Sequence, residues 1–527
     1  VKSPSVDLSF MTAGDGGLKT RDRKMVYLIG AGPGDPGLIT LRGVACLKEA
    51  DVVVYDYLVD REILRHARPD ARFIYVGKQG SDHTVTQDRL NEILVEEARL
   101  GRVVARLKGG DPFIFGRGGE EAEVLFENGI PFEVVPGVTS AISVPAYAGI
   151  PLTHREFTSS VAFVTGHEDP DKAESRVHWG SLAAVETLVF LMGVKNLGRI
   201  AANLRDHGKP GKTPCALIRW GTTADQETVT GTLDDIEARA QERGIAPPAV
   251  LVVGEVVRLR EKMNWFETKP LFGKGVVVTR PAEQSKEMAR LLAGEGARVI
   301  RFPTIRIVET EEKGALDGVL DRLEEYRWVV FTSANGVRFF LKGLAERGKD
   351  LRALQGARVA VIGPATAEML RRHGIAADLV PETFISEGIL EAFRGIDLAG
   401  ARVLLPRAEE ARDVLPEGLA ARGAAVDVVP VYRTVRADTD RSVLDGEIEK
   451  GTVDVLTFTS PSTVKHFFAI MGEGFAVPRG VRVACIGPVT AAALEKRGVP
   501  VDIVQEPYSV PGLVEALRNL FRREDGR

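Results

Sequence analysis

The chain of 527 residues has few of the residues that build disulfide frameworks or metal centres. Its three cysteines, Cys46, Cys215 and Cys485, lie far apart without a CxxC pair, and its eight histidines show no HExxH pattern. This scarcity argues against a disulfide scaffold and against a metal cofactor, and it favours a reducing cytoplasm as the location.

Long uncharged apolar runs are also missing. No stretch reaches the roughly 18–20 residues that a membrane-spanning helix needs. Residues 1–24 are polar and lack the apolar centre of a signal peptide, so we expect a disordered extension there. The formal net charge is only −4 with both signs interspersed, which gives no indication of nucleic-acid binding.

What the chain does contain is a regular alternation of apolar strands and helical segments from Met25 to about residue 257, which predicts an α/β fold. One helix is expected over Gln87–Leu100. The predicted strands are Val26–Ile29, Val52–Tyr55, Phe73–Val76, Val103–Leu107, Phe132–Val135, Val161–Thr165, Thr187–Met192, Cys215–Arg219 and Val250–Val253.

The pattern breaks over 261–274, which we interpret as a linker between domains 25–260 and 275–527. After it the chain repeats itself. VVVTRP at 276–281 returns 127 positions later as VLLPRA, and FTSANGVRFF at 331–340 returns at the same offset as FTSPSTVKHF. The second half therefore contains two copies of one α/β unit, and a ligand cleft is expected between two similar lobes.

The loop GAGPGD at 30–35 follows the first strand and resembles a nucleotide-binding loop with the wrong chemistry. Asp35 would repel a phosphate, and Pro33 lacks a backbone N–H that would hold one. The loop therefore predicts a ligand with little phosphate character, and it argues against an NAD-dependent oxidoreductase.

Asp56 and Lys78 end the second and third predicted strands, at one edge of the sheet. There they are candidates for a base and a proton donor. Asp56 as the cap of the following turn, and Lys78 as a solvated surface charge, are the alternatives.

The order of motifs in this half resembles the tetrapyrrole methyltransferase family, and closely the uroporphyrinogen-III C-methyltransferases. The most diagnostic stretch is RLKGGDPFIFGRGGEE at 106–121, supported by YDYLV, VVPGVTSA, PLTHR, TGH and LVFLMG. The resemblance implies two α/β subdomains, a homodimer and S-adenosylmethionine as cosubstrate. It also implies Asp56 as proton acceptor and Lys78 as proton donor. The implied cosubstrate contacts are Pro33, Gly109, Gly110, Asp111, Ile114, Thr139, Ser140, Met192 and Gly221.

Four cations of this half, Arg106, Lys108, Arg117 and Arg155, are candidates to pair with the acetate and propionate groups of a tetrapyrrole. Surface charges or internal ion pairs are the alternative for each.

In the second half, Thr332-Ser333 and Thr459-Ser460 end equivalent strands, and Arg280 and Arg407 do the same. The hydroxyl side chains are typical helix caps, which is the favoured interpretation, but with the two arginines they are also candidates to bind substrate carboxylates.

The motif order of this half resembles uroporphyrinogen-III synthase. The resemblance implies a bilobal α/β fold whose lobes, 275–305 with 435–520 and 306–430, are joined by a two-stranded ladder of Pro303–Val308 and Val428–Thr434. It also implies Tyr432 as the residue that assists the leaving hydroxyl.

Together the two resemblances imply a bifunctional enzyme. The second half would cyclise hydroxymethylbilane to uroporphyrinogen III, and the first would methylate that product to precorrin-2, for siroheme or cobalamin. One alternative is a methyltransferase of another corrinoid or a non-tetrapyrrole acceptor. Another makes the second half a two-lobed binding module without catalysis.

Overall fold

The computed structural model describes residues 24–77, 85–166, 177–312, 314–504 and 506–524. The chain divides into two compact units, Val1–Gly273 and Lys274–Arg527. Lys78 and nearly all of the extension expected over 1–24 lie outside the described residues. Within those ranges, no helix is long and apolar enough to cross a membrane.

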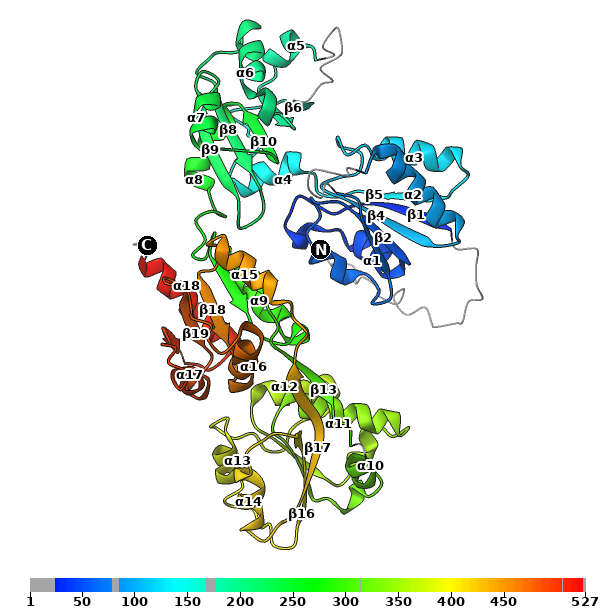
Figure 1. The fold of residues 1–527 in the computed structure, drawn as a ribbon, viewed down its shortest axis with the longest axis vertical. Coiled ribbons are helices and arrows are strands. Elements are labelled where there is room, and N and C mark those ends of the chain that lie inside the picture. Colours follow the sequence, from blue (N-terminus) through cyan, green and yellow to red (C-terminus); the bar gives the residue numbers. More distant parts are fainter. Residues whose placement is uncertain (1–23, 78–84, 167–176, 313, 505, 525–527) are drawn as a thin grey trace, which may run out of the picture. The chain divides into compact units, whose positions relative to one another are not determined.

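The first unit opens with a parallel sheet in the order β3-β2-β4-β1-β5 (Figure 1). Helix α1 packs on one face and helices α2 and α3 on the other, which is why most of its strands are apolar throughout. The elements are β1 (Met25–Gly30), α1 (Leu41–Glu49), β2 (Val52–Tyr55), β3 (Arg72–Tyr75), α2 (Gln87–Arg99), β4 (Val103–Lys108), α3 (Gly118–Glu127), β5 (Phe132–Val135) and α4 (Ser140–Tyr147).

A second sheet of this unit has the order β6-β7-β10-β8-β9 and is antiparallel except for the pair β6–β7. All nine strands predicted in this half are confirmed to within one residue. The tenth, β9, was missed because its sequence ETVTGT buries only Val229. The elements are β6 (Val161–Thr165), α5 (Trp179–Ala183), β7 (Thr187–Leu191), α6 (Leu197–Asp206), β8 (Pro214–Arg219), β9 (Glu227–Thr232), α7 (Ile236–Glu242), β10 (Ala249–Val253) and α8 (Arg260–Met263).

The segment expected to be a linker, 261–274, is packed within the first unit over most of its length. Phe266 and Leu271 are buried, and Glu267 accepts hydrogen bonds from Gln226 and Thr228 at 2.7 and 2.6 Å. These apolar anchors and buried polar contacts hold the segment, and the boundary between the two units falls after Gly273.

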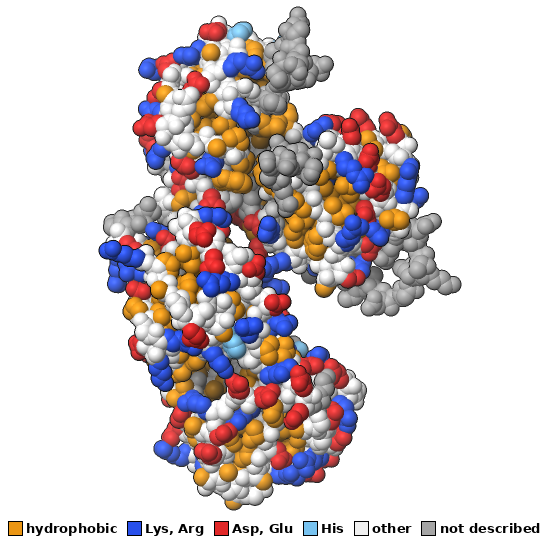
Figure 2. Space-filling model, viewed as in Figure 1, with side chains coloured by type: hydrophobic (Ala, Val, Ile, Leu, Met, Phe, Trp, Pro, Cys, Tyr) orange, Lys and Arg blue, Asp and Glu red, His pale blue; other side chains and the backbone are white. Residues whose placement is uncertain are grey.

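In the second unit, what we call lobe one is a parallel sheet in the order β12-β11-β18-β19-β20 with its helices. On the face of the whole molecule that Figure 2 shows, Lys and Arg side chains are interspersed with Asp and Glu side chains. The elements of lobe one are β11 (Gly275–Val278), α9 (Lys286–Gly294), β12 (Arg298–Arg301), α15 (Arg441–Glu449), β18 (Val455–Phe458), α16 (Pro461–Met471), β19 (Arg482–Cys485), α17 (Pro488–Glu495), β20 (Ile503–Val504) and α18 (Val510–Glu524).

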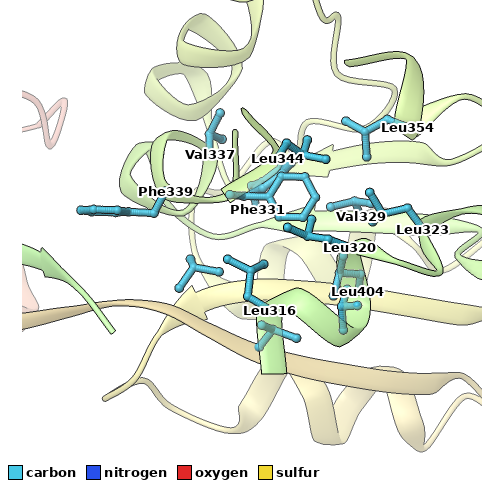
Figure 3. Packing of buried hydrophobic residues seen from close by; sticks show 14 of the residues in the cluster. Leu316, Leu320, Leu323, Val329, Phe331, Val337, Phe339, Leu344, Leu354 and Leu404 are labelled. Carbon is cyan, nitrogen blue, oxygen red and sulfur yellow. The ribbon is translucent and has the colours of Figure 1, made fainter. Parts of the chain in front are cut away.

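Lobe two has the sheet order β13-β17-β16-β14-β15. Leu316 and Leu320 of α10 and Leu344 of α11 pack with Val329 and Phe331 of β14 in its core (Figure 3). The elements are β13 (Ile305–Glu309), α10 (Gly314–Leu320), β14 (Trp328–Phe331), α11 (Ala334–Glu346), β15 (Arg358–Val361), α12 (Pro364–Arg372), α13 (Ser386–Ala392), β16 (Arg402–Ala408), α14 (Val414–Ala420) and β17 (Ala425–Arg436).

The two-stranded ladder expected from the sequence is the antiparallel pair of β13 and β17, which runs from Ile305 opposite Arg436 to Glu309 opposite Tyr432. It therefore involves the end of β17 rather than the whole of 428–434. The earlier part of β17 pairs in parallel with β16 instead. The ladder strand thus continues directly into the sheet of lobe two.

The sequence repeats do not correspond to the lobes one to one. Lobe one pairs β11, from the first copy, with β18, from the second. Lobe two pairs β14, from the first copy, with β16, from the second. Each lobe is therefore built from half of each copy, and neither copy completes a sheet alone.

Candidate functional sites

A cavity of about 520 Å³ lies in the first unit where strand ends and loops of its two sheets meet. Such a volume is typical of sites for small ligands. Residues from the segments 32–34, 57–60, 109–116, 140–144, 191–195, 218–223 and 247–250 line it.

Most of the cosubstrate contacts expected from the sequence line this cavity, and two do not. The Asp111 carboxylate instead accepts hydrogen bonds from the backbone N–H groups of Phe113, Ile114 and Gly137. Thr139 caps α4. Both side chains therefore order loops around the cavity. The expected contacts that do line the cavity are Pro33, Gly109, Gly110, Ile114, Ser140, Met192 and Gly221.

Backbone strain gathers around the same cavity. Five non-glycine residues among those that the structure describes have a positive φ, between 46° and 70°. Three line the cavity and the other two adjoin residues that do. Because such conformations persist only where the surrounding structure enforces them, their clustering makes the cavity the candidate functional site of this unit. The five are Phe115, Arg117, Met192, Trp220 and Thr222.

Glycines allow the strand ends to approach one another closely. A Cβ on Gly30 would lie 2.4 Å from the Gly137 Cα, and one on Gly137 would lie 2.3 Å from the Gly110 carbonyl oxygen. The loops after β1, β4 and β5 therefore pack backbone against backbone beside the cavity, which no larger residue would permit.

Asp35, the residue that made the GAGPGD loop unlike a phosphate loop, does not line the cavity. Its carboxylate accepts hydrogen bonds from the Tyr147 hydroxyl and the Gly37 N–H, both at 2.7 Å, and its own N–H donates to Thr222. Burial and the Asp35 carboxylate raise the pKa of Tyr147. Sequence reasoning missed Tyr147 and Thr222, which follow Asp35 by 112 and 187 positions.

Arg106 and Lys108 were candidates for substrate binding, and the structure gives both an internal partner instead. They lie two positions apart on β4, and both contact Glu121 of α3, at 3.4 and 2.5 Å respectively. Arg106 also contacts Asp56 at 3.3 Å. The side chains of Arg106, Lys108 and Glu121 are buried. The interpretation as an internal ion pair is therefore favoured for both cations.

Asp56 makes the contact of the alternative considered from the sequence, the cap of the following turn, and its role as a base stays a prediction. One carboxylate oxygen accepts a hydrogen bond from the Leu58 N–H, which orders the following turn, and the other faces Arg106. Burial lowers the pKa of Lys108, and the Arg106 charge acts in the same direction.

Arg117 is exposed and pairs with Glu120, and Arg155 is exposed.

In the second unit, Tyr432 is buried and its hydroxyl lies 2.9 Å from the Ser333 Oγ. Its ring stacks on Phe339 at 5.8 Å. Burial raises the pKa of Tyr432, so the phenol keeps its proton at neutral pH.

Ser333 and Ser460 cap α11 and α16, as the favoured interpretation predicted. Thr332 and Thr459, beside them, are half-buried. That these threonines and serines bind substrate carboxylates stays a prediction.

The equivalent arginines Arg280 and Arg407 differ. Arg407 is buried and donates to the Arg412 carbonyl at 3.0 Å and to Asp413 at 2.6 Å. The Nε of Arg280 is buried and has no hydrogen-bond partner among the described residues, and burial lowers the pKa of this guanidinium. Of the two, Arg280 has the unmet hydrogen-bonding capacity that a carboxylate ligand would satisfy.

These features define two α/β units in one chain: a two-sheet unit with a cavity and a bilobal unit with exchanged repeats. Residues 25–237 match the tetrapyrrole (corrin/porphyrin) methylases, and residues 286–515 match uroporphyrinogen-III synthase HemD. The chain is 38% identical over 498 residues to the porphyrin biosynthesis protein HemD of Ruminiclostridium josui, covering 93% of this chain and 97% of that protein. The chain belongs to both families, one in each half.

Two further similarities concern the first half. The chain is 56% identical over 237 residues to the S-adenosyl-L-methionine-dependent uroporphyrinogen III methyltransferase of Methanosarcina barkeri, covering 45% of this chain and 93% of that protein. It is 40% identical to a solved uroporphyrin-III C-methyl transferase of Thermus thermophilus complexed with S-adenyl homocysteine, covering 45% of this chain and 94% of that one, with a TM-score of 0.39.

Proposed function

We propose that the second unit cyclises hydroxymethylbilane to uroporphyrinogen III, with loss of water and inversion of ring D, and that the first unit methylates this product at C2 and C7 to give precorrin-2. The observation that carries the proposal is the co-occurrence of the two families in one chain, since the product of one is the substrate of the other. The relative named for porphyrin biosynthesis matches across both halves.

The methyl donor is S-adenosylmethionine, held in the cavity of the first unit. The cavity is large enough for such a ligand, and apolar side chains such as Met192 and Ile114 and several glycines line it. A cosubstrate without phosphates suits these groups. The relative from Methanosarcina barkeri is named for the same donor.

Asp56 accepts the proton that the substrate must lose. Methylation of a pyrrole carbon that already bears a side chain leaves a cationic ring, and the charge is lost when a proton departs from a neighbouring position of the conjugated system, such as the adjacent bridging methylene. Asp56 is partly exposed, which leaves its carboxylate within reach of a substrate, and the Arg106 guanidinium lies 3.3 Å from it. Lys78 remains the proposed proton donor.

In the second unit Tyr432 assists departure of the hydroxyl of hydroxymethylbilane as water. Its raised pKa suits an acid, since the phenol is protonated before the reaction. Arg280, with its buried unpaired Nε, binds a carboxylate of the substrate. The rest of the unit holds the linear chain in a curled conformation.

The protein acts as a homodimer through its methyltransferase unit, in the cytoplasm, on small tetrapyrroles and without a metal or a nucleic acid. Its three cysteines are free and buried, which suits a reducing compartment. The product feeds siroheme or cobalamin synthesis.

Two separate assays of the purified chain test the two activities. Hydroxymethylbilane alone must give uroporphyrinogen III, and supplied uroporphyrinogen III with S-adenosylmethionine must give precorrin-2. Methylation only of another acceptor would reject the first unit's substrate. Absence of cyclisation would leave a binding module in the second unit.

A further inference from the structure

The hairpin between β8 and β9, in the second sheet of the first unit, is hydrogen-bonded to the loop after β1 in the first sheet. The Asp35 N–H donates to the Thr222 Oγ1 at 3.0 Å, across 187 positions of sequence. Trp220 and Thr223 of the hairpin line the cavity, and so does Pro33 of the loop. The bond therefore joins two walls of the cavity that come from different sheets.

Thr222 makes this contact in a strained backbone conformation. Its φ is +70°, a left-handed value that a β-branched residue rarely adopts. Such a conformation costs free energy and persists only where neighbouring contacts enforce it. Thr222 is also buried, with 3% of its surface exposed, so its backbone N–H needs a partner inside the protein.

Gln226 supplies that partner. Its Oε1 accepts the Thr222 N–H at 2.8 Å, and its Nε2 donates to the Glu267 Oε1 at 2.7 Å. Because a backbone N–H requires an acceptor and a carboxylate requires a donor, these two contacts fix which end of the amide faces which neighbour. Gln226 is itself buried. Its amide therefore connects Glu267 to the backbone of the strained residue.

Glu267 is held by two further contacts. Its Oε1 also accepts from the Thr228 hydroxyl at 2.6 Å, and its Oε2 pairs with Arg260. Glu267 lies in the segment 261–274, which is packed within the first unit. A line of three hydrogen bonds thus runs from this segment through Gln226 and Thr222 to the loop after β1.

We infer that Gln226 and Glu267 are positioning residues for the methyl donor. They keep Thr222 in its left-handed conformation, and Thr222 in turn holds the loop and the hairpin in the arrangement that lines the cavity. The inference rests on the proposed function, in which this cavity binds S-adenosylmethionine. Neither Gln226 nor Glu267 lines the cavity, so both act through Thr222. Without them the hairpin also populates other conformations, and the apparent affinity falls in proportion to the competent fraction.

Gln226→Leu tests the inference with a side chain of similar size that neither donates nor accepts a hydrogen bond. It leaves the buried Thr222 N–H without its acceptor, and we expect the Kd for S-adenosylmethionine to rise about tenfold. Calorimetric titration of the purified full-length chain measures this without any tetrapyrrole. In methylation of supplied uroporphyrinogen III, KM for S-adenosylmethionine should rise likewise while kcat stays within about twofold, because the loaded protein already has the competent conformation.

Thr228→Val is the matched control. It removes a hydrogen bond to the same Glu267 carboxylate from a half-buried residue of β9, but it leaves the contact between Gln226 and Thr222 in place. Affinity for S-adenosylmethionine should stay within about twofold of wild type.

Glu267→Gln is a milder variant that keeps the test decisive if Gln226→Leu does not fold. It preserves the length and shape of the side chain, but its NH₂ group must face one of the donors that the carboxylate accepts from. We expect binding of S-adenosylmethionine about threefold weaker than in the wild type, since the change acts on Thr222 only through Gln226.

A double variant separates positioning from a general structural effect. Glycine adopts a positive φ without support, so in a Thr222→Gly background the conformation no longer depends on Gln226. There Gln226→Leu should weaken binding much less than it does in the wild type. Equal losses in the two backgrounds, or wild-type affinity in both Gln226→Leu and Glu267→Gln, would overturn the inference. A wild-type chain that does not bind S-adenosylmethionine would instead reject the function proposed for this cavity.

Discussion

The Tyr147 hydroxyl donates a hydrogen bond to the Asp35 carboxylate at 2.7 Å, which joins the loop after the first strand to helix α4. Ser140 and Val144 of that helix line the cavity, as do Gly32, Pro33 and Gly34 of the loop. The bond therefore ties two walls of the proposed cosubstrate site together.

Removing this hydroxyl should weaken the site. Tyr147→Phe leaves the Asp35 carboxylate with one partner fewer, and we expect a loss of about 1–3 kcal/mol in unfolding free energy and weaker binding of S-adenosylmethionine. Tryptophan fluorescence during denaturation and calorimetric titration measure the two effects. Tyr508→Phe, at an exposed tyrosine bonded to Glu506 in the second unit, is the control that should change neither. Wild-type affinity and stability in Tyr147→Phe would contradict this account.

The same bond predicts a pH dependence. Burial and Asp35 raise the Tyr147 pKa in the folded state, whereas in the unfolded chain a tyrosine titrates near about 10. The stabilisation is therefore complete below about pH 10 and is lost as the pH rises from there toward the folded pKa. Unfolding free energy of the wild type should fall more steeply above pH 10 than that of Tyr147→Phe. Parallel curves for the two proteins would refute it.

Glu121 should be far more important for stability than its neighbour Glu120. Glu121→Gln removes the carboxylate that Arg106 and Lys108 share in the interior, and the expected loss is about 3–5 kcal/mol. Glu120 pairs with Arg117 at the surface, so Glu120→Gln should cost less than about 1 kcal/mol. Adding Lys108→Met to Glu121→Gln should restore part of the loss. Equal effects of the two glutamate substitutions in chemical denaturation would show that the buried pair is unimportant.

The two equivalent arginines should separate binding from stability. Arg280→Met is expected to raise KM for hydroxymethylbilane by about tenfold with little change in unfolding, since this guanidinium has an unpaired buried Nε. Arg407→Met removes internal bonds to Arg412 and Asp413, so it should destabilise the second unit by about 1.5–3 kcal/mol. Steady-state kinetics and denaturation of both variants check this, and the reverse pattern would exchange the assigned roles.

The strands of the first unit could be predicted because parallel, buried strands are continuous apolar runs. Strand β9 could not, since its pattern of threonines and glycine resembles a loop and its place comes from pairing with β8. The repeat was visible in the sequence. The exchange of its halves was implied only by the lobe boundaries that came with the resemblance to the synthase family, and it is seen in the pairing of β11 with β18 and of β14 with β16.

The candidate sites were predictable in position more than in contacts. Motifs placed Pro33, Gly110 and Met192 at one cavity, which the structure contains. The partner of each charge could not be read from the chain, because Glu121 meets Lys108 only once α3 packs on β4. Likewise Asp35 was interpreted through its effect on a ligand, whereas its carboxylate is satisfied by Tyr147.

The most direct test of the central claim is a single reaction of the purified full-length chain with hydroxymethylbilane and S-adenosylmethionine under anaerobic conditions. Products are followed by absorbance and mass spectrometry. The account predicts that hydroxymethylbilane is consumed and that precorrin-2, carrying two added methyl groups, accumulates. Unmethylated uroporphyrinogen as the final product, or hydroxymethylbilane without any uroporphyrinogen III, would contradict the claim that one chain performs both steps.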